Sequence, residues 1–141
     1  MTLSRKRVDV WIVALKPFQS KLAGSSPDSG RTKPRIITSR SRAPYAAVLI
    51  AEALGCDAVR LGSAGAKAMA VVLGEADIYV HDGGMYQWDS AAPAAVSLAA
   101  GLHASRIDGS PLVYNERDPW LPDFIVCRAE LAEPALKAIW G

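Results

Sequence analysis

The chain has 141 residues, of which half are apolar and 21% are charged. This length allows one domain with a substantial core, the composition is typical of a soluble globular protein, and no apolar run is long enough to span a membrane. The formal net charge of +2 is unevenly distributed, because residues 1–42 hold ten Lys and Arg against two Asp and Glu, whereas residues 43–141 hold six against twelve. The basic segment could contact nucleic acid or a phosphorylated ligand, or it could be a solvated, partly disordered leader; we expect the leader and no nucleic-acid partner.

Residues 1–34 are predicted to form a basic leader or linker. Val8–Leu15 alternates weakly and could be a strand, and Lys16–Pro34 contains three prolines and a Gly-Ser-Ser run, which is typical of a loop. The basic Ser4–Arg7 before this apolar stretch faintly resembles a signal peptide, but Asp9 interrupts the stretch and no clear cleavage site follows. We therefore expect a cytoplasmic protein with no membrane partner.

Residues 35–141 are predicted to form one α/β domain, because short apolar strands alternate with amphipathic helices. The two cysteines show no metal or redox spacing and are expected to be buried thiols of a reducing compartment. The predicted strands are Ile36–Thr38, Ala58–Leu61, Ala76–His81, His103–Ile107 and Phe124–Cys127; the predicted helices are Ala43–Leu54, Ala64–Leu73, Ser90–Ala100 and Glu130–Trp140; Asp82–Gln87 is predicted to be a loop.

The stretch from Trp88 to Pro93 combines a lone carboxylate with a helix start. The predicted helix begins just after Asp89, and Pro93 fits its first turn, where the missing N–H is not needed. The free N–H groups of a first turn favour anions, and a carboxylate beside them could hold a hard cation. An aspartate at a helix start is usually only an N-cap, so these residues alone favour capping over cation binding.

Several ordered blocks together resemble the inositol-monophosphatase-like, magnesium-dependent, lithium-sensitive phosphatases, and within them the bacterial 3'(2'),5'-bisphosphate nucleotidases, which hydrolyse 3'-phosphoadenosine 5'-phosphate. The similarity runs from about Arg35 to Cys127. It implies the C-terminal α/β half of that family's αβαβα layered sandwich. The blocks that carry it are Thr38–Ser41, Leu61–Lys67, Gly74–Tyr79, Trp88–Ala92 and Asp108–Asn115.

The resemblance makes Asp89 a ligand of Mg²⁺. The family's other ligands come from a Glu-Glu segment and an Asp-Pro-hydrophobic-Asp-Gly-Thr motif, and neither occurs in this sequence. Asp118–Asp123 begins in a similar way but lacks the Asp-Gly-Thr end, so it is interpreted as a loop. One carboxylate cannot organise a near-octahedral Mg²⁺, and we expect the chain alone to be inactive: a truncation, the product of a broken gene, or one piece of a two-chain enzyme. The partners that we consider are a second copy in a homodimer and a missing N-terminal half.

The resemblance also implies a set of residues that contact a phosphorylated small molecule, either adenosine 3',5'-bisphosphate or an inositol phosphate. Relatives commonly have histidine at the position of Arg42, although an arginine can still bind phosphate. Lys67 could instead be a solvated helix lysine, and Asp82 a loop carboxylate in solvent; His103 is expected to be structural, and Tyr114 with Asn115 could stack on adenine or only pack in the core. The implied substrate-binding residues are Ser39, Arg40, Ser41, Arg42, Gly62, Ser63, Lys67, His81 and Asp82.

Three functions stay open from the sequence. The first is a fragment of a magnesium-dependent phosphomonoesterase. The second is a non-catalytic module that binds phosphate or nucleotide. The third is a remnant interaction domain whose exposed face pairs with another chain.

Overall fold

A computed structural model describes residues 32–39, 43–114 and 117–141. A five-stranded sheet with the order β2-β1-β3-β7-β5 lies at its centre. The neighbours β2, β1 and β3 are parallel, whereas β7 runs antiparallel to both β3 and β5. The bounds are β1 Arg35–Ser39, β2 Asp57–Leu61, β3 Ile78–His81, β5 His103–Ser105 and β7 Phe124–Cys127.

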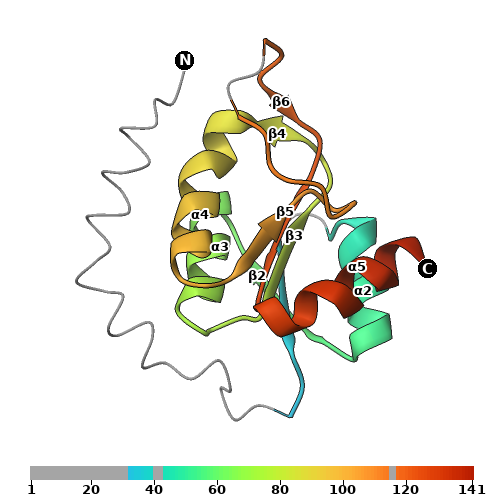
Figure 1. Ribbon diagram of the computed structural model, residues 1–141. Helices are drawn as coiled ribbons and strands as arrows, with labels where there is room; N and C mark the ends of the chain where they lie inside the picture. Colours follow the sequence, from blue (N-terminus) through green and yellow to red (C-terminus); the bar gives the residue numbers. More distant parts are fainter. Residues whose placement is uncertain (1–31, 40–42, 115–116) are drawn as a thin grey trace.

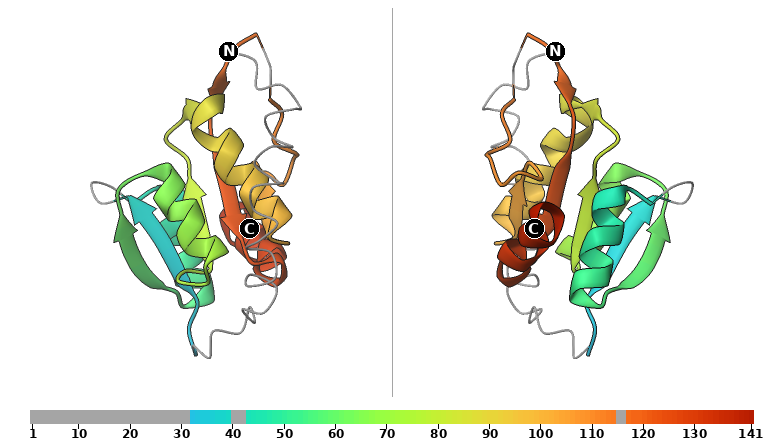
Figure 2. Two further views of the ribbon diagram at one scale, coloured as in Figure 1. Left: turned by 90° about the vertical axis from the view of Figure 1, so that its left-hand side faces the viewer. Right: turned by 90° about the vertical axis from the view of Figure 1, so that its right-hand side faces the viewer.

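Helices cover both faces of this sheet (Figures 1 and 2). Helices α2 (Tyr45–Leu54) and α5 (Ala132–Trp140) pack on the face formed by Ile36, Ile78 and Ile125, and α5 follows a 3-10 turn, η1 (Ala129–Leu131). Helices α3 (Ala64–Val72) and α4 (Gln87–Ala99) lie on the opposite face. Strands buried on both faces read as continuous apolar runs, as in Phe124–Cys127. The predicted layered α/β fold is confirmed.

The sequence failed to predict a second, two-stranded sheet. Its strands are β4 (Met85–Tyr86), in the segment predicted as a loop, and β6 (Trp120–Leu121), in the Asp118–Asp123 loop. Each strand has only two residues, and their pairing joins segments far apart in sequence, so local alternation could not show them. His103 was predicted to be structural, and its ring makes a local hydrogen bond: its Nε2 lies 2.7 Å from the Oγ of Ser105.

The start of α4 is the main correction to the predicted elements. The helix begins at Gln87 and not after Asp89, so Asp89 lies in the first turn and Pro93 lies inside the helix. The predicted place of Pro93 in the first turn is therefore wrong. Tyr86, a residue type that sequence rules do not favour as an N-cap, precedes the helix, and its N–H donates to the Asp89 carboxylate over 3.2 Å.

The remaining expectations on the leader fall outside the described residues, including the strand considered at Val8–Leu15. Cys127 is buried as predicted, whereas Cys56 is only partly buried, and both thiols are free. Within the described ranges, no helix is both long and apolar enough to cross a membrane.

Gly84 offers a test of the small sheet's geometry. Its φ is +81°, and an added Cβ would lie 2.0 Å from Trp120 Cζ2. Gly84→Ala should lower the free energy of unfolding by about 2 kcal/mol, because backbone strain and a clash combine, although the half-exposed Trp120 ring can shift. Gly55→Ala is the matched control in chemical denaturation: its φ is +65° with nothing within 4 Å of the added atom, so it should cost only about 1 kcal/mol. Equal losses in the two variants would contradict the clash.

Candidate anion site at the carboxyl ends of the parallel strands

The fold brings several of the predicted substrate residues to one edge of the sheet. Because β2, β1 and β3 are parallel neighbours, their carboxyl ends meet there. Ser39 ends β1, Gly62 and Ser63 follow β2, and His81 ends β3 just before Asp82. Ligands of α/β proteins commonly bind at such an edge. Arg40, Ser41, Arg42 and Asn115 lie outside the described residues, so their predicted contacts stay predictions.

Ser63 begins helix α3 at this edge. It is the N-cap, with extended backbone, and its Oγ accepts a hydrogen bond from the Ala66 N–H over 3.0 Å. The preceding Gly62 is exposed, as is Ser63 itself. The cap leaves the hydroxyl proton of Ser63 able to donate, and the first N–H groups of a helix favour an anion.

Lys67 is buried, which contradicts the alternative of a solvated helix lysine. Its side chain is only 4% exposed, and its Nζ lies 5.1 Å from the centroid of the Tyr79 ring. Burial lowers the pKa of the Lys67 ammonium. Lys67 occupies the sheet-facing side of α3 together with Ala68 and Val71, both of which are buried. The sequence signal is one cation at a core position of an otherwise apolar helix, and such a residue needs either a partner or a ligand.

The side chains of His81 and Asp82 both make hydrogen bonds to the backbone at this edge of the sheet. The His81 Nε2 donates to the Gly84 carbonyl over 2.8 Å, which fixes the turn after β3. The Asp82 carboxylate accepts from the Ala46 N–H over 3.2 Å, so it caps the first turn of α2, whose own N-cap is Pro44. Asp82 is therefore not a loose loop carboxylate, and its predicted contact with a sugar hydroxyl stays a prediction.

Asp89 is exposed in the first turn of α4, where its carboxylate accepts the Tyr86 N–H, so it is the third helical residue and not the N-cap that the sequence offered as an alternative. Its predicted role as a Mg²⁺ ligand remains untested. Across the part of the chain that the structure describes, no group of three or more His, Cys, Asp or Glu could hold a metal ion. A single exposed carboxylate does not meet the demand of Mg²⁺ for several converging oxygens, so the described residues alone do not fit this ion.

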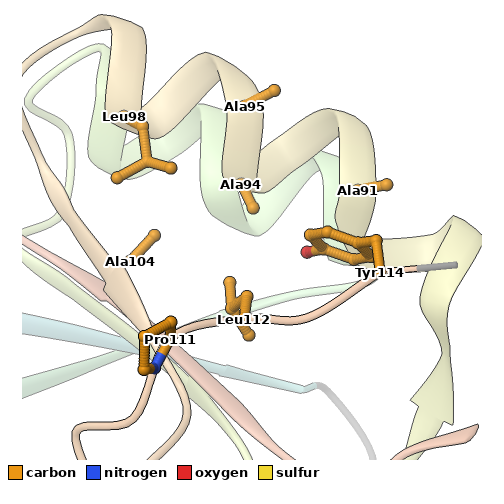
Figure 3. Close-up of a pocket in the computed structure, with 8 residues that line it drawn as sticks. All are labelled: Ala91, Ala94, Ala95, Leu98, Ala104, Pro111, Leu112 and Tyr114. Carbon is orange, nitrogen blue, oxygen red and sulfur yellow. The ribbon is translucent and has the colours of Figure 1, made fainter. Parts of the chain in front are cut away.

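Tyr114 lies beside an apolar groove that the sequence did not predict. Its hydroxyl is 3.1 Å from the Oγ of the buried Ser90. The groove has a volume of about 450 Å³ and separates helix α4 from the segment before Tyr114 (Figure 3). The residues that α4 contributes to one wall of the groove recur at helical spacing in the sequence. This spacing is the sequence signal that could have revealed the groove. The lining residues are Ala91, Ala94, Ala95, Leu98, Ala104, Pro111, Leu112 and Tyr114.

The chain belongs to the inositol monophosphatase family, whose sequence profile matches residues 19–140. It is 57% identical over 105 residues to a 3'-phosphoadenosine 5'-phosphate phosphatase of Mycobacterium leprae, covering 74% of this chain and 39% of that protein. It is 53% identical over 117 residues to the protein of the same name from Mycobacterium bovis, covering 83% of this chain and 44% of that protein. The crystal structure of CysQ from Bacteroides thetaiotaomicron is 30% identical with a TM-score of 0.60, covering 70% of this chain and 38% of that chain.

These comparisons confirm the predicted family. The chain spans about two-fifths of the length of the curated relatives that it matches.

Proposed function

We propose that this chain binds the phosphate groups of 3'-phosphoadenosine 5'-phosphate and contributes this binding to a phosphomonoesterase. The observation that carries the proposal is the buried Lys67, whose only ring or charge contact in the described structure is the face of Tyr79. A desolvated ammonium attracts an oxyanion strongly, because the interior screens charge less than water does. The names of the relatives with more than half of the matched residues identical support the choice of substrate.

The binding step draws on groups around the start of α3. The Lys67 ammonium supplies charge, the Ser63 hydroxyl can donate a hydrogen bond, and the first N–H groups of α3 point along the helix axis. Arg40 and Arg42, which the sequence resemblance suggested as phosphate contacts, would add guanidinium forks. A ligand with two phosphates would thus be favoured over an uncharged nucleoside.

Catalysis requires more than the described residues supply. Members of this family generally use Mg²⁺, but the described part of the chain offers no group of three potential ligands. We assign no chemical step to these residues, and we propose that additional ligands come from outside them. The homodimer or first-half partner that the sequence suggested, the domain division at residue 35 and the cytoplasmic location all remain predictions.

The second candidate function is a non-catalytic module that binds phosphate or nucleotide. The same two observations favour it: the described residues offer a buried cation for an anion but no cluster of metal ligands. The two candidates share the binding step and differ only in turnover, so binding and phosphate release must be measured on the same preparation.

Calorimetry and phosphate release together test the proposal. We expect adenosine 3',5'-bisphosphate to bind more tightly than adenosine or inositol 1-phosphate, and added salt to weaken the binding. We also expect the purified 141-residue chain to release no phosphate above background with Mg²⁺, and Asp89→Asn to change neither result. Equal affinity for adenosine and its bisphosphate would contradict the phosphate site. Turnover that needs Mg²⁺ and disappears in Asp89→Asn would show a complete enzyme.

A further inference from the structure

We infer that Tyr79 is a positioning residue for Lys67, whose ammonium it holds in the charged state while leaving the positive charge available to an anionic ligand. The inference rests on the proposed phosphate-binding function of Lys67 and extends it to a second residue. Three features carry it: the rigidity of the ring, the contact between the ring and the ammonium, and the absence of a carboxylate paired with Lys67.

The Tyr79 ring is fixed by the centre of the sheet. Strand β3 lies between β1 and β7, where Tyr79 is in register with Ile37 and Val126. Its side chain is 1% exposed, and the Phe124 ring meets it edge to face, with centroids 5.1 Å apart and an interplanar angle of 88°. An aromatic ring that is packed between two neighbouring strands and against a perpendicular ring cannot turn away from the helix above it.

The ammonium is brought to this ring by the start of α3. The Ser63 cap and the hydrogen bond from the Lys67 N–H to the Ser63 carbonyl, over 3.0 Å, fix the first turn of the helix. The Lys67 Nζ then lies 5.1 Å from the Tyr79 centroid, within the range of a cation–π interaction. Such contacts are strongest when the cation is desolvated, as it is at a side chain that is 4% exposed.

The elements packed against α3 leave the charge of Lys67 unneutralised. From β3, the titratable groups on this face are Tyr79 itself and His81, whose Nε2 is bonded to the Gly84 carbonyl. From α4 the carboxylate is Asp89, which is exposed and bonded to the Tyr86 N–H. The residues of β7 on this face are Phe124 and an apolar valine. No ion pair joins Lys67 to any residue in the described ranges.

A ring and a carboxylate would have opposite consequences for a ligand. A carboxylate would stabilise the ammonium and cancel its charge, whereas a π face stabilises it without adding a formal charge. The ring face, not the hydroxyl, is the relevant part, because the Tyr79 Oη is buried with no hydrogen-bond partner in the described structure. Burial also raises the pKa of Tyr79, so its hydroxyl stays neutral.

The test compares Tyr79→Leu, which removes the ring, with Tyr79→Phe, which keeps it. Two quantities are measured on the full chain: the affinity for adenosine 3',5'-bisphosphate, by calorimetry, and the pKa of the Lys67 ammonium without ligand, by NMR titration. Tyr79→Leu should weaken binding about tenfold and lower the Lys67 pKa, because the uncharged amine is no longer disfavoured by the ring. Tyr79→Phe should match the wild type in both.

Ile125→Ala controls for lost packing. Ile125 is fully buried but belongs to the cluster on the opposite face of the sheet, against α2 and α5. Ile125→Ala should reduce stability while leaving the ligand affinity and the Lys67 pKa unchanged. The comparison therefore separates a general loss of packing from a positioning role of Tyr79. The inference is overturned if Tyr79→Leu keeps the wild-type pKa of Lys67, or if Ile125→Ala alters affinity as much as Tyr79→Leu does. If the wild type fails to bind the bisphosphate, the proposed function fails, and the Lys67 pKa in the three variants alone decides the inference.

Discussion

Asp77→Ala should lower the free energy of unfolding by about 2–3 kcal/mol, because the Arg35 N–H loses its buried acceptor and Arg128 loses one of its two carboxylate partners. Asp77 is 1% exposed just before β3, and its carboxylate accepts the Arg35 N–H over 2.7 Å and the Arg128 guanidinium over 3.1 Å. Its backbone adds two more links, since the Asp77 N–H donates to the Arg35 carbonyl and the Arg128 N–H donates to the Asp77 carbonyl. One residue therefore joins the start of β1 to the end of β7.

The structure supplies a matched control for Asp77→Ala on the same arginine. Glu130 also pairs with the Arg128 guanidinium, but half of its side chain is exposed. Glu130→Ala should cost less than about 1 kcal/mol, because exposed ion pairs contribute little. Urea denaturation of the two variants measures the difference, and a loss in Asp77→Ala no larger than in Glu130→Ala would show that burial of the carboxylate is unimportant.

The layered fold could be predicted from the sequence because its signals are local. Apolar runs such as Phe124–Cys127 and the glycine after α2 mark strand and helix ends within a few residues. The start of α4 could not be predicted in this way, because its N-cap is a tyrosine. The Asp89 carboxylate, which accepts a hydrogen bond from that N-cap, lies in the first turn and not before it. Strands β4 and β6 depend on pairing across more than thirty residues, which no local pattern reports.

The residues of the proposed anion site could be named from the sequence, but their surroundings in the fold could not. The resemblance named Ser63, Lys67 and Asp82 one by one, and the order of the parallel strands then explains why Ser63 and Asp82 lie at the same edge of the sheet. What the sequence could not decide was whether Lys67 faces water or the sheet. That choice depends on the rotation of α3 over β3, which is set by the packing of Ala68 and Val71 in the core. The hydrogen bond by which Asp82 caps α2 joins residues 36 positions apart, so no local sequence pattern could predict it.

Lys67→Met should have opposite effects on ligand affinity and on stability. Loss of the ammonium removes a charge-assisted contact to phosphate, so affinity for adenosine 3',5'-bisphosphate should fall roughly 100-fold. Stability should rise by about 1 kcal/mol, because a methionine of similar length fills the site without a buried charge. Lys137→Met, at an exposed position near the end of α5, is the matched control and should change neither quantity.

The stability of the wild type relative to Lys67→Met should depend on pH, and so should its ligand affinity. Burial lowers the pKa of Lys67 in the folded chain below its ordinary value, so between the folded and unfolded pKa values the unfolded state binds more protons. The wild type should therefore gain stability relative to Lys67→Met as pH rises through that interval, and its affinity for the bisphosphate should fall as the ammonium loses its proton. Thermal unfolding and calorimetry over the alkaline range measure both trends. A stability difference between the two proteins that stays constant with pH would mean that Lys67 titrates as a solvated lysine, and the buried cation proposed to bind phosphate would be refuted.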